Sequence, residues 1–186
     1  MKNIKDLYHF SNILYLNRYY GESLLILHGI SFGIKIGKQL NLKWSDFINE
    51  RGHIKEFITI DDKIIPLNNK CKTMTIVIYK LLNDKVNLND YIYTTKQGKR
   101  LSTDNLSKNL KRLYKILLND NCEELTATSL EKVWALSIIE YHNYTKSIFI
   151  YLKDYLGKKT MNDLIQFVGV SPQEKILLKF DLIDEF

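Results

Sequence analysis

Several lysines lie close to glycines in the sequence, and segments of this kind can bind phosphate groups. The segment Gly33-Ile34-Lys35-Ile36-Gly37-Lys38 is superficially similar to a phosphate-binding loop, but no Ser or Thr follows the lysine and the glycine spacing differs. We predict no parallel strand leading into it and therefore reject this kind of site. The four histidines (positions 9, 28, 53 and 142) and the cysteines Cys71 and Cys122 lack metal-ligand spacing. We expect neither a metal nor a cofactor.

The overall charge favours a polyanionic partner. Lys and Arg total 27 against 21 Asp and Glu, which gives a net charge of +6 over 186 residues. Such a surplus favours nucleic acid, and a basic but merely solvated surface explains it equally well. Four cations lie on the polar face of one predicted helix, where solvation and DNA contact are again balanced explanations: Lys108, Lys111, Arg112 and Lys115.

Length and composition indicate one globular domain spanning residues 1–186. Hydrophobic residues make up 45% of the chain and charged residues 26%, which argues against disorder. No apolar run reaches the roughly 18 residues of a membrane span. The first ten residues mix charge into the sequence and hold no signal-peptide core. The cysteines form no disulfide framework, so we predict a cytoplasmic protein without a membrane partner.

Hydrophobic periodicity predicts a mainly helical (α+β) chain with a small antiparallel sheet. The predicted helices cover residues 3–20, 22–31, 33–43, 72–83, 104–118, 128–142, 147–156 and 160–169. Two strands between residues 54 and 67 are predicted to meet at a tight Asp61-Asp62 turn, and Tyr91-Ile92-Tyr93 reads as a further short strand. The tail, residues 173–186, is amphipathic and can pack on its own core or on a second protomer.

Three structural expectations concern small sets of residues. Gly29, Gly33 and Gly37 recur every four residues, which permits close helix packing or marks a break between two helices. Trp44 and Trp134 are predicted to be core residues. Thr128 and Glu131 have capping-box spacing, and this cap is our preferred explanation for Glu131.

Motifs in a fixed order carry a family resemblance. They are Gly33 to Ile36 followed by Leu40 to Asp46, Ile65-Pro66-Leu67, Tyr91 to Tyr114, and Leu156-Gly157-Lys158. Their order and spacing resemble the catalytic domain of tyrosine recombinases (phage integrases) over about residues 5–168. The resemblance implies that fold, and it implies that the family's N-terminal core-binding domain is missing from this chain.

The family's chemistry depends on a few side chains. Two arginines grip the scissile phosphate, a lysine and histidines bind phosphate or transfer protons, and a tyrosine attacks phosphorus to form a covalent link. Carried over by position, these places hold Lys35, Thr128, Glu131, Lys132, Lys158 and Phe167. The hairpin lysine has no clear counterpart, and Lys63 is a nearby candidate.

These substitutions predict a pseudoenzyme. Phe167 has no oxygen to attack phosphorus, and a carboxylate at Glu131 repels a phosphate by about 4 kcal/mol at about 4 Å and an effective dielectric of about 20. Tyr151 or Tyr155 as a replacement nucleophile is disfavoured because the arginine clamp is also lost. Phe167 is expected to fill space where a tyrosine ring would lie.

Three hypotheses follow for function. The first is a catalytically inactive recombinase-like protein of a mobile genetic element, which binds duplex DNA or assists an intact recombinase in DNA recombination and integration. Its predicted DNA-binding residues are Lys35, Lys43, Lys108, Lys111, Arg112, Lys115, Lys132 and Lys158; solvated surface lysines are the alternative. The tail could pair with another copy or with an intact recombinase. The other hypotheses are a protein–protein interaction module without DNA binding and a divergent active recombinase.

Overall fold

The computed structural model describes residues 3–82, 85–120, 125–126 and 128–169. In chain order its elements are α1 (Ile4–Leu16), α2 (Tyr20–Phe32), α3 (Ile36–Gln39), α4 (Trp44–Phe47), β1 (Phe57–Ile60), β2 (Lys63–Pro66), α5 (Asn69–Leu82), α6 (Thr103–Leu118), α7 (Ser129–Tyr141), α8 (Lys146–Tyr155) and α9 (Met161–Val168). The prediction of a mainly helical chain with a small antiparallel sheet is confirmed. Within these residues, no helix is long and apolar enough to cross a membrane. The tail 173–186 and Cys122 lie outside the described residues.

The predicted strand pair is present. β1 and β2 run antiparallel, with Phe57 opposite Pro66 and Ile60 opposite Lys63. Asp61 and Asp62 both adopt positive φ, at 47° and 63°, which gives the two-residue turn that a tight hairpin requires. Pro66 stands at the strand end, where its missing N–H costs no ladder bond.

Two predicted elements are wrong. A helix over residues 33–43 does not form, because Gly33 ends α2 with φ +61° and α3 is only four residues long. Residues 91–93 form no named strand. Instead Lys43 and Tyr91 form an isolated bridge, and the Ile92 amide donates to the Leu42 carbonyl at 3.1 Å. The apolar residues there serve a buried loop rather than a sheet.

Glycines on α2 bring α7 close to it. A Cβ placed on Gly29 would lie 2.6 Å from Leu130, and one on Gly33 would lie 2.0 Å from the Trp134 ring. Two of the three spaced glycines therefore serve close packing, and Gly33 also marks the break; a Cβ on Gly37 would meet nothing within 4 Å. The Trp134 ring is buried, as predicted, and so is Trp44.

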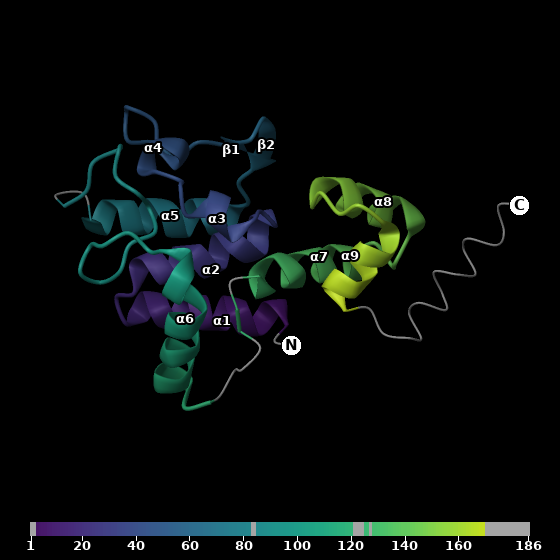
Figure 1. Cartoon of the computed structure of the whole chain (residues 1–186). Helices are drawn as coiled ribbons and strands as arrows, with labels where there is room; N and C mark the ends of the chain where they lie inside the picture. The colour runs from purple at the N-terminus through teal and green to yellow at the C-terminus, as the bar shows by residue number, and fades with distance from the viewer. Residues whose placement is uncertain (1–2, 83–84, 121–124, 127, 170–186) are drawn as a thin grey trace, which may run out of the picture.

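The described hydrophobic core has two parts that α7 joins. The larger part involves α1 to α6 and the hairpin, and the start of α7 reaches it through Leu130 and Val133. The smaller part gathers Trp134, Ile139 and apolar residues of α8 and α9. Figure 1 shows α7 running from the larger body into this three-helix group. Surfaces where the two parts meet are thus set by the start of α7.

A buried histidine connects α2 to two other segments. His28 is fully buried; its Nδ1 lies 2.8 Å from the Tyr93 hydroxyl and its Nε2 lies 2.9 Å from Thr75 Oγ1. The ring also stacks on Phe47, with centroids 4.7 Å apart. Burial lowers the pKa of His28 to about 3, so the ring is neutral in the folded chain.

We expect folding stability to fall with acid because of His28. Its pKa in the folded chain lies below the ordinary value of 6.5, so below that pH the unfolded chain binds a proton that the folded chain does not. The stabilisation is therefore complete above about pH 6.5 and is lost as the pH falls toward about 3. The free energy of unfolding should drop by about 2 kcal/mol from about pH 7 to about pH 5. Urea unfolding of His9→Gln should show the same drop and His28→Gln should not; a flat profile in the unmodified chain would refute the neutral buried ring.

Candidate functional site

A small cleft forms where the end of α2, the hairpin, the start of α7 and the end of α8 meet. Its volume is about 160 Å³, below the roughly 300 Å³ of a typical drug-sized pocket, so it suits a single small group. The charged and polar side chains that line it include Lys35, Lys38, Asp61, Lys63, Glu131 and Tyr155. We call this space the cleft. It brings residues from five elements and loops to one place.

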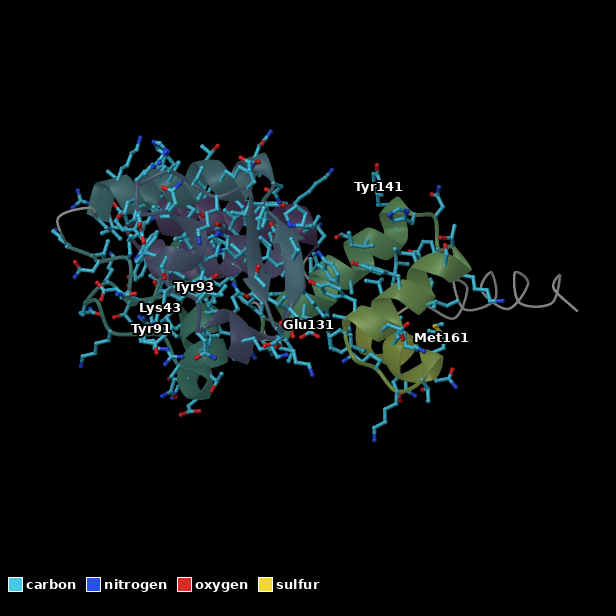
Figure 2. The ribbon with its side chains drawn as sticks, turned by 90° about the horizontal axis from the view of Figure 1, so that it is seen from above. Lys43, Tyr91, Tyr93, Glu131, Tyr141 and Met161 are labelled. Carbon is cyan, nitrogen blue, oxygen red and sulfur yellow. The ribbon has the colours of Figure 1, made fainter. Side chains whose placement is uncertain are left out.

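Glu131 forms the acidic wall of the cleft. It stands in the first turn of α7, is only 7% exposed, and lies at the junction of the two parts of the fold (Figure 2). Burial raises the pKa of Glu131, while the positive charges of Lys158 and Lys35 lower it. The carboxyl group is thus buried within electrostatic reach of two predicted site lysines.

The predicted capping box between Thr128 and Glu131 is wrong. Thr128 is the residue before α7, but its φ of −80° and ψ of −14° are helical rather than extended, and its side chain makes no capping bond. A cap needs the extended conformation to turn its hydroxyl toward the free amides. The Thr128 hydroxyl instead lies 3.1 Å from that of Thr126. Glu131 is therefore free of a capping role and faces the lysines.

The hairpin contributes Lys63 to the cleft. Its ammonium donates to the Tyr155 carbonyl oxygen at 2.6 Å and lies 4.1 Å from the centre of the Tyr155 ring. Partial burial lowers the pKa of Lys63, with smaller contributions from Lys38 and Lys35. On the other side of the turn, Asp61 forms an ion pair with Lys38. The hairpin turn is thus joined both to α3 and to the end of α8.

The Phe167 ring lies against the ammonium groups of two lysines. The Lys158 ammonium lies 3.5 Å from the centre of its ring and that of Lys132 lies 5.4 Å from it. These are cation–π contacts with the electron-rich ring face. Lys132 and Lys158 therefore meet at Phe167, while Lys158 and Lys35 act electrostatically on Glu131.

Tyr155 has little nucleophilic character in this arrangement. Its hydroxyl donates to the Phe32 carbonyl at 2.7 Å, and its ring packs 5.0 Å from that of Trp134. Burial, then Tyr151 and Glu131, raise the pKa of Tyr155 to about 12. The phenol is therefore protonated and engaged at neutral pH. This geometry supports the expectation that Tyr155 is not a substitute nucleophile.

Other predicted DNA-binding residues lie away from the cleft. Lys43 is next to Tyr91 in Figure 2, with its ammonium 5.8 Å from the ring centre, and the Arg100 guanidinium lies 3.9 Å from the same ring. Lys108, Lys111, Arg112 and Lys115 belong to α6, which contributes no residue to the cleft. The eight predicted DNA-binding residues are therefore spread over separate surfaces.

Three charged residues that line the cleft escaped the sequence analysis, namely Lys38, Asp61 and Asp154. Lys38 and Asp61 form the ion pair that fixes the hairpin turn, and neither was predicted as a site residue. Their signal was present but weak: Lys38 follows Lys35 by three positions, and Asp61 occupies the predicted turn. Only the folded chain brings the two segments together.

Comparison with known proteins yields a structural likeness but no sequence match. No protein-family model matches the chain, and neither does any curated protein. Among solved structures, the crystal structure of XerA recombinase superposes with a TM-score of 0.67 over 94% of this chain, at 15% sequence identity. The fold is recombinase-like. The likeness covers 60% of the XerA chain, and at this identity it establishes the fold alone.

Proposed function

We propose that this chain is a recombinase-like DNA-binding or accessory protein that does not cut strands. The observation that supports the proposal is the set of groups in and beside the cleft: Lys35, Lys38 and Lys63 line it with the buried Glu131, and Phe167, which the sequence resemblance aligns with the nucleophile, packs against Lys158 nearby. Lysine ammoniums attract phosphate but cannot grip it bidentately as guanidinium groups do. Affinity without cleavage is the behaviour that this set of groups supports best.

The charges of the cleft favour weak, salt-sensitive binding. Lys35, Lys63 and Lys158 provide positive charge near one small space, and Glu131 offsets part of it. Affinity for DNA depends on how many phosphates are neutralised and falls with salt in proportion to that number. A protein that contacts few phosphates is therefore expected to bind only at low ionic strength, in keeping with an accessory role.

A gel shift with duplex DNA tests this proposal. Replacing Lys35 and Lys158 together by glutamine should weaken binding about tenfold at about 50 mM salt and reduce the slope of log affinity against log salt by about 2. Lys5→Gln with Lys80→Gln, at exposed positions on α1 and α5, is the matched control because it removes the same charge, and it should change binding little. No binding of the unmodified chain at low salt would contradict the proposal, as would a double variant that behaves like the control.

One observation favours the second candidate, a protein–protein interaction module. Large apolar side chains are exposed near the end of α1 and along α5, namely Leu16 at 74%, Leu81 at 54% and Val77 at 36%. Tyr15 and Val77 line one shallow, mostly apolar depression. Exposed apolar area of this kind is typical of interaction surfaces. Failure of DNA binding in the gel shift would favour this candidate over the first.

A further inference from the structure

A second, larger cavity lies at the other end of α2 from the cleft. It occupies about 650 Å³ between the α1–α2 turn, the end of α5 and the loop over residues 94–98, and we call it the groove. The cleft lies at Gly33 and the groove at Gly21, so about 18 Å of helix separates them. Figure 1 shows the α1–α2 turn and the hairpin at opposite ends of the larger body. The groove is therefore independent of the cleft.

The groove is lined by positive charge. Arg18, Lys85 and Lys96 are exposed there, and none of them has an ion-pair partner among the described residues. The Lys96 ammonium lies 4.0 Å from the centre of the Tyr19 ring, which holds it at the rim. Lys96 also acts on the charge of Glu22, as does Arg112 of α6. Three cations from three segments of the chain thus line the groove.

The acidic group near the groove is buried beneath it. Glu22 is 2% exposed, and burial raises its pKa while Asn109, Lys96 and Arg112 favour its charged form. Its Oε1 accepts from Asn109 at 3.5 Å. The carboxyl group is thus covered by protein and is not part of the groove lining, and the charges of Lys96 and Arg112 offset its own. An anion that enters the groove meets the cations first.

Besides its cations, the groove offers groups that suit the parts of a nucleotide other than its phosphates. The Thr95 hydroxyl is buried and has no hydrogen-bond partner within the described structure. Tyr20 provides an aromatic ring, and Leu82 and Val86 provide apolar surface. A volume of about 650 Å³ lies within the range of small-molecule sites, whereas the cleft is too small. Cations suit phosphates, and a tyrosine ring suits a base.

We propose that the groove binds a nucleotide unit, with its phosphates on Arg18 and Lys96 and its base against Tyr20. The unit can come from a free nucleotide or from an unpaired nucleic acid strand, since both present the same chemistry. This site requires neither the cleft nor its lysines. It adds a contact for nucleotides that duplex binding at the cleft does not provide.

Fluorescence anisotropy on the full chain tests the groove with two probes, a methylanthraniloyl-labelled ADP and a labelled oligothymidylate of about ten nucleotides. The double variant Arg18→Gln with Lys96→Gln should weaken binding of the favoured probe about tenfold or more at about 50 mM salt. Lys96→Arg should retain binding, and Lys5→Gln, an exposed position on α1 that lines neither the cleft nor the groove, should leave it unchanged. Circular dichroism confirms that each variant is folded.

The two probes separate the two sources of the ligand. Binding of the labelled ADP alone assigns the groove to free nucleotides, and tighter binding of the oligonucleotide assigns it to an unpaired strand. Absence of binding by both probes at about 1 mM would overturn the proposal. It would equally be overturned if the groove variants bound as the unmodified chain does, or if Lys5→Gln lost the same affinity.

Discussion

Replacing Glu131 by glutamine is expected to strengthen binding of duplex DNA roughly a hundredfold at low salt. Unit charges about 6 Å apart interact by about 3 kcal/mol at an effective dielectric of about 20, and removing a repulsion of this size corresponds to about that factor. Glu131 is buried, so water screens it little, and the amide occupies nearly the same volume. The measurement is a titration of labelled duplex DNA by anisotropy at about pH 8, where the carboxylate is ionised.

The pH dependence of binding provides a second readout of Glu131. Its raised pKa means that acidification removes its charge at a higher pH than usual, so the unmodified chain should gain affinity as the pH falls while Glu131→Gln gains less. The charges that act on Glu131 are those of Lys158 and Lys35, and the cleft is further lined by Lys38, Lys63, Asp61, Asp154 and Tyr155.

Glu50→Gln is the matched control for this prediction. Glu50 is exposed in a loop outside the cleft, and its replacement changes the net charge by the same amount. If both variants bind DNA equally well, overall charge governs affinity and the cleft is not the phosphate site. A loss of affinity in Glu131→Gln would show that the carboxylate holds the lysines in place rather than repelling the ligand.

Gly33→Ala is expected to destabilise the fold by about 3 kcal/mol or more. A Cβ there would lie 2.0 Å from the Trp134 ring, and the φ of +61° strains any side chain. The ring cannot move freely, because it packs against Tyr155 and belongs to the core of the three-helix group. The start of α7, and with it Glu131, should shift away from the cleft.

Chemical denaturation measures this effect, and Gly37→Ala is its control. A Cβ on Gly37 meets nothing within 4 Å, and this residue lies in α3 with no positive φ. The free energy of unfolding should therefore change by less than about 1 kcal/mol in the control. Equal stability of the two variants would show that α2 and α7 are less closely packed than described.

The fold was predictable wherever local chemistry decided the outcome. The Asp61-Asp62 turn was found because residues that tolerate positive φ separate two short apolar runs. The helix over residues 33–43 failed because one glycine conformation outweighed the apolar pattern that follows it. Tyr91 to Tyr93 resembled a strand because buried loops and strands share apolar residues, and only tertiary contacts separate the two.

The site was only partly predictable for the same reason. Lys35, Glu131 and Lys158 were predicted from the order of motifs, and the fold brings both lysines within electrostatic reach of Glu131. The capping box failed because spacing alone does not fix the backbone of Thr128. Lys38 and Asp61 were missed because their ion pair joins segments 23 residues apart, which no local pattern records. Pairings of this kind follow from topology.

A search for a covalent protein–DNA link tests the proposed absence of strand cleavage most directly. Labelled nicked duplexes of mixed sequence, which trap a cut strand, are incubated with the chain, denatured and separated by size. Because Phe167 has no hydroxyl and that of Tyr155 is hydrogen-bonded to Phe32, we predict that no label migrates with the protein. Label that stays attached after denaturation and maps to a tyrosine, such as Tyr151, would contradict this account.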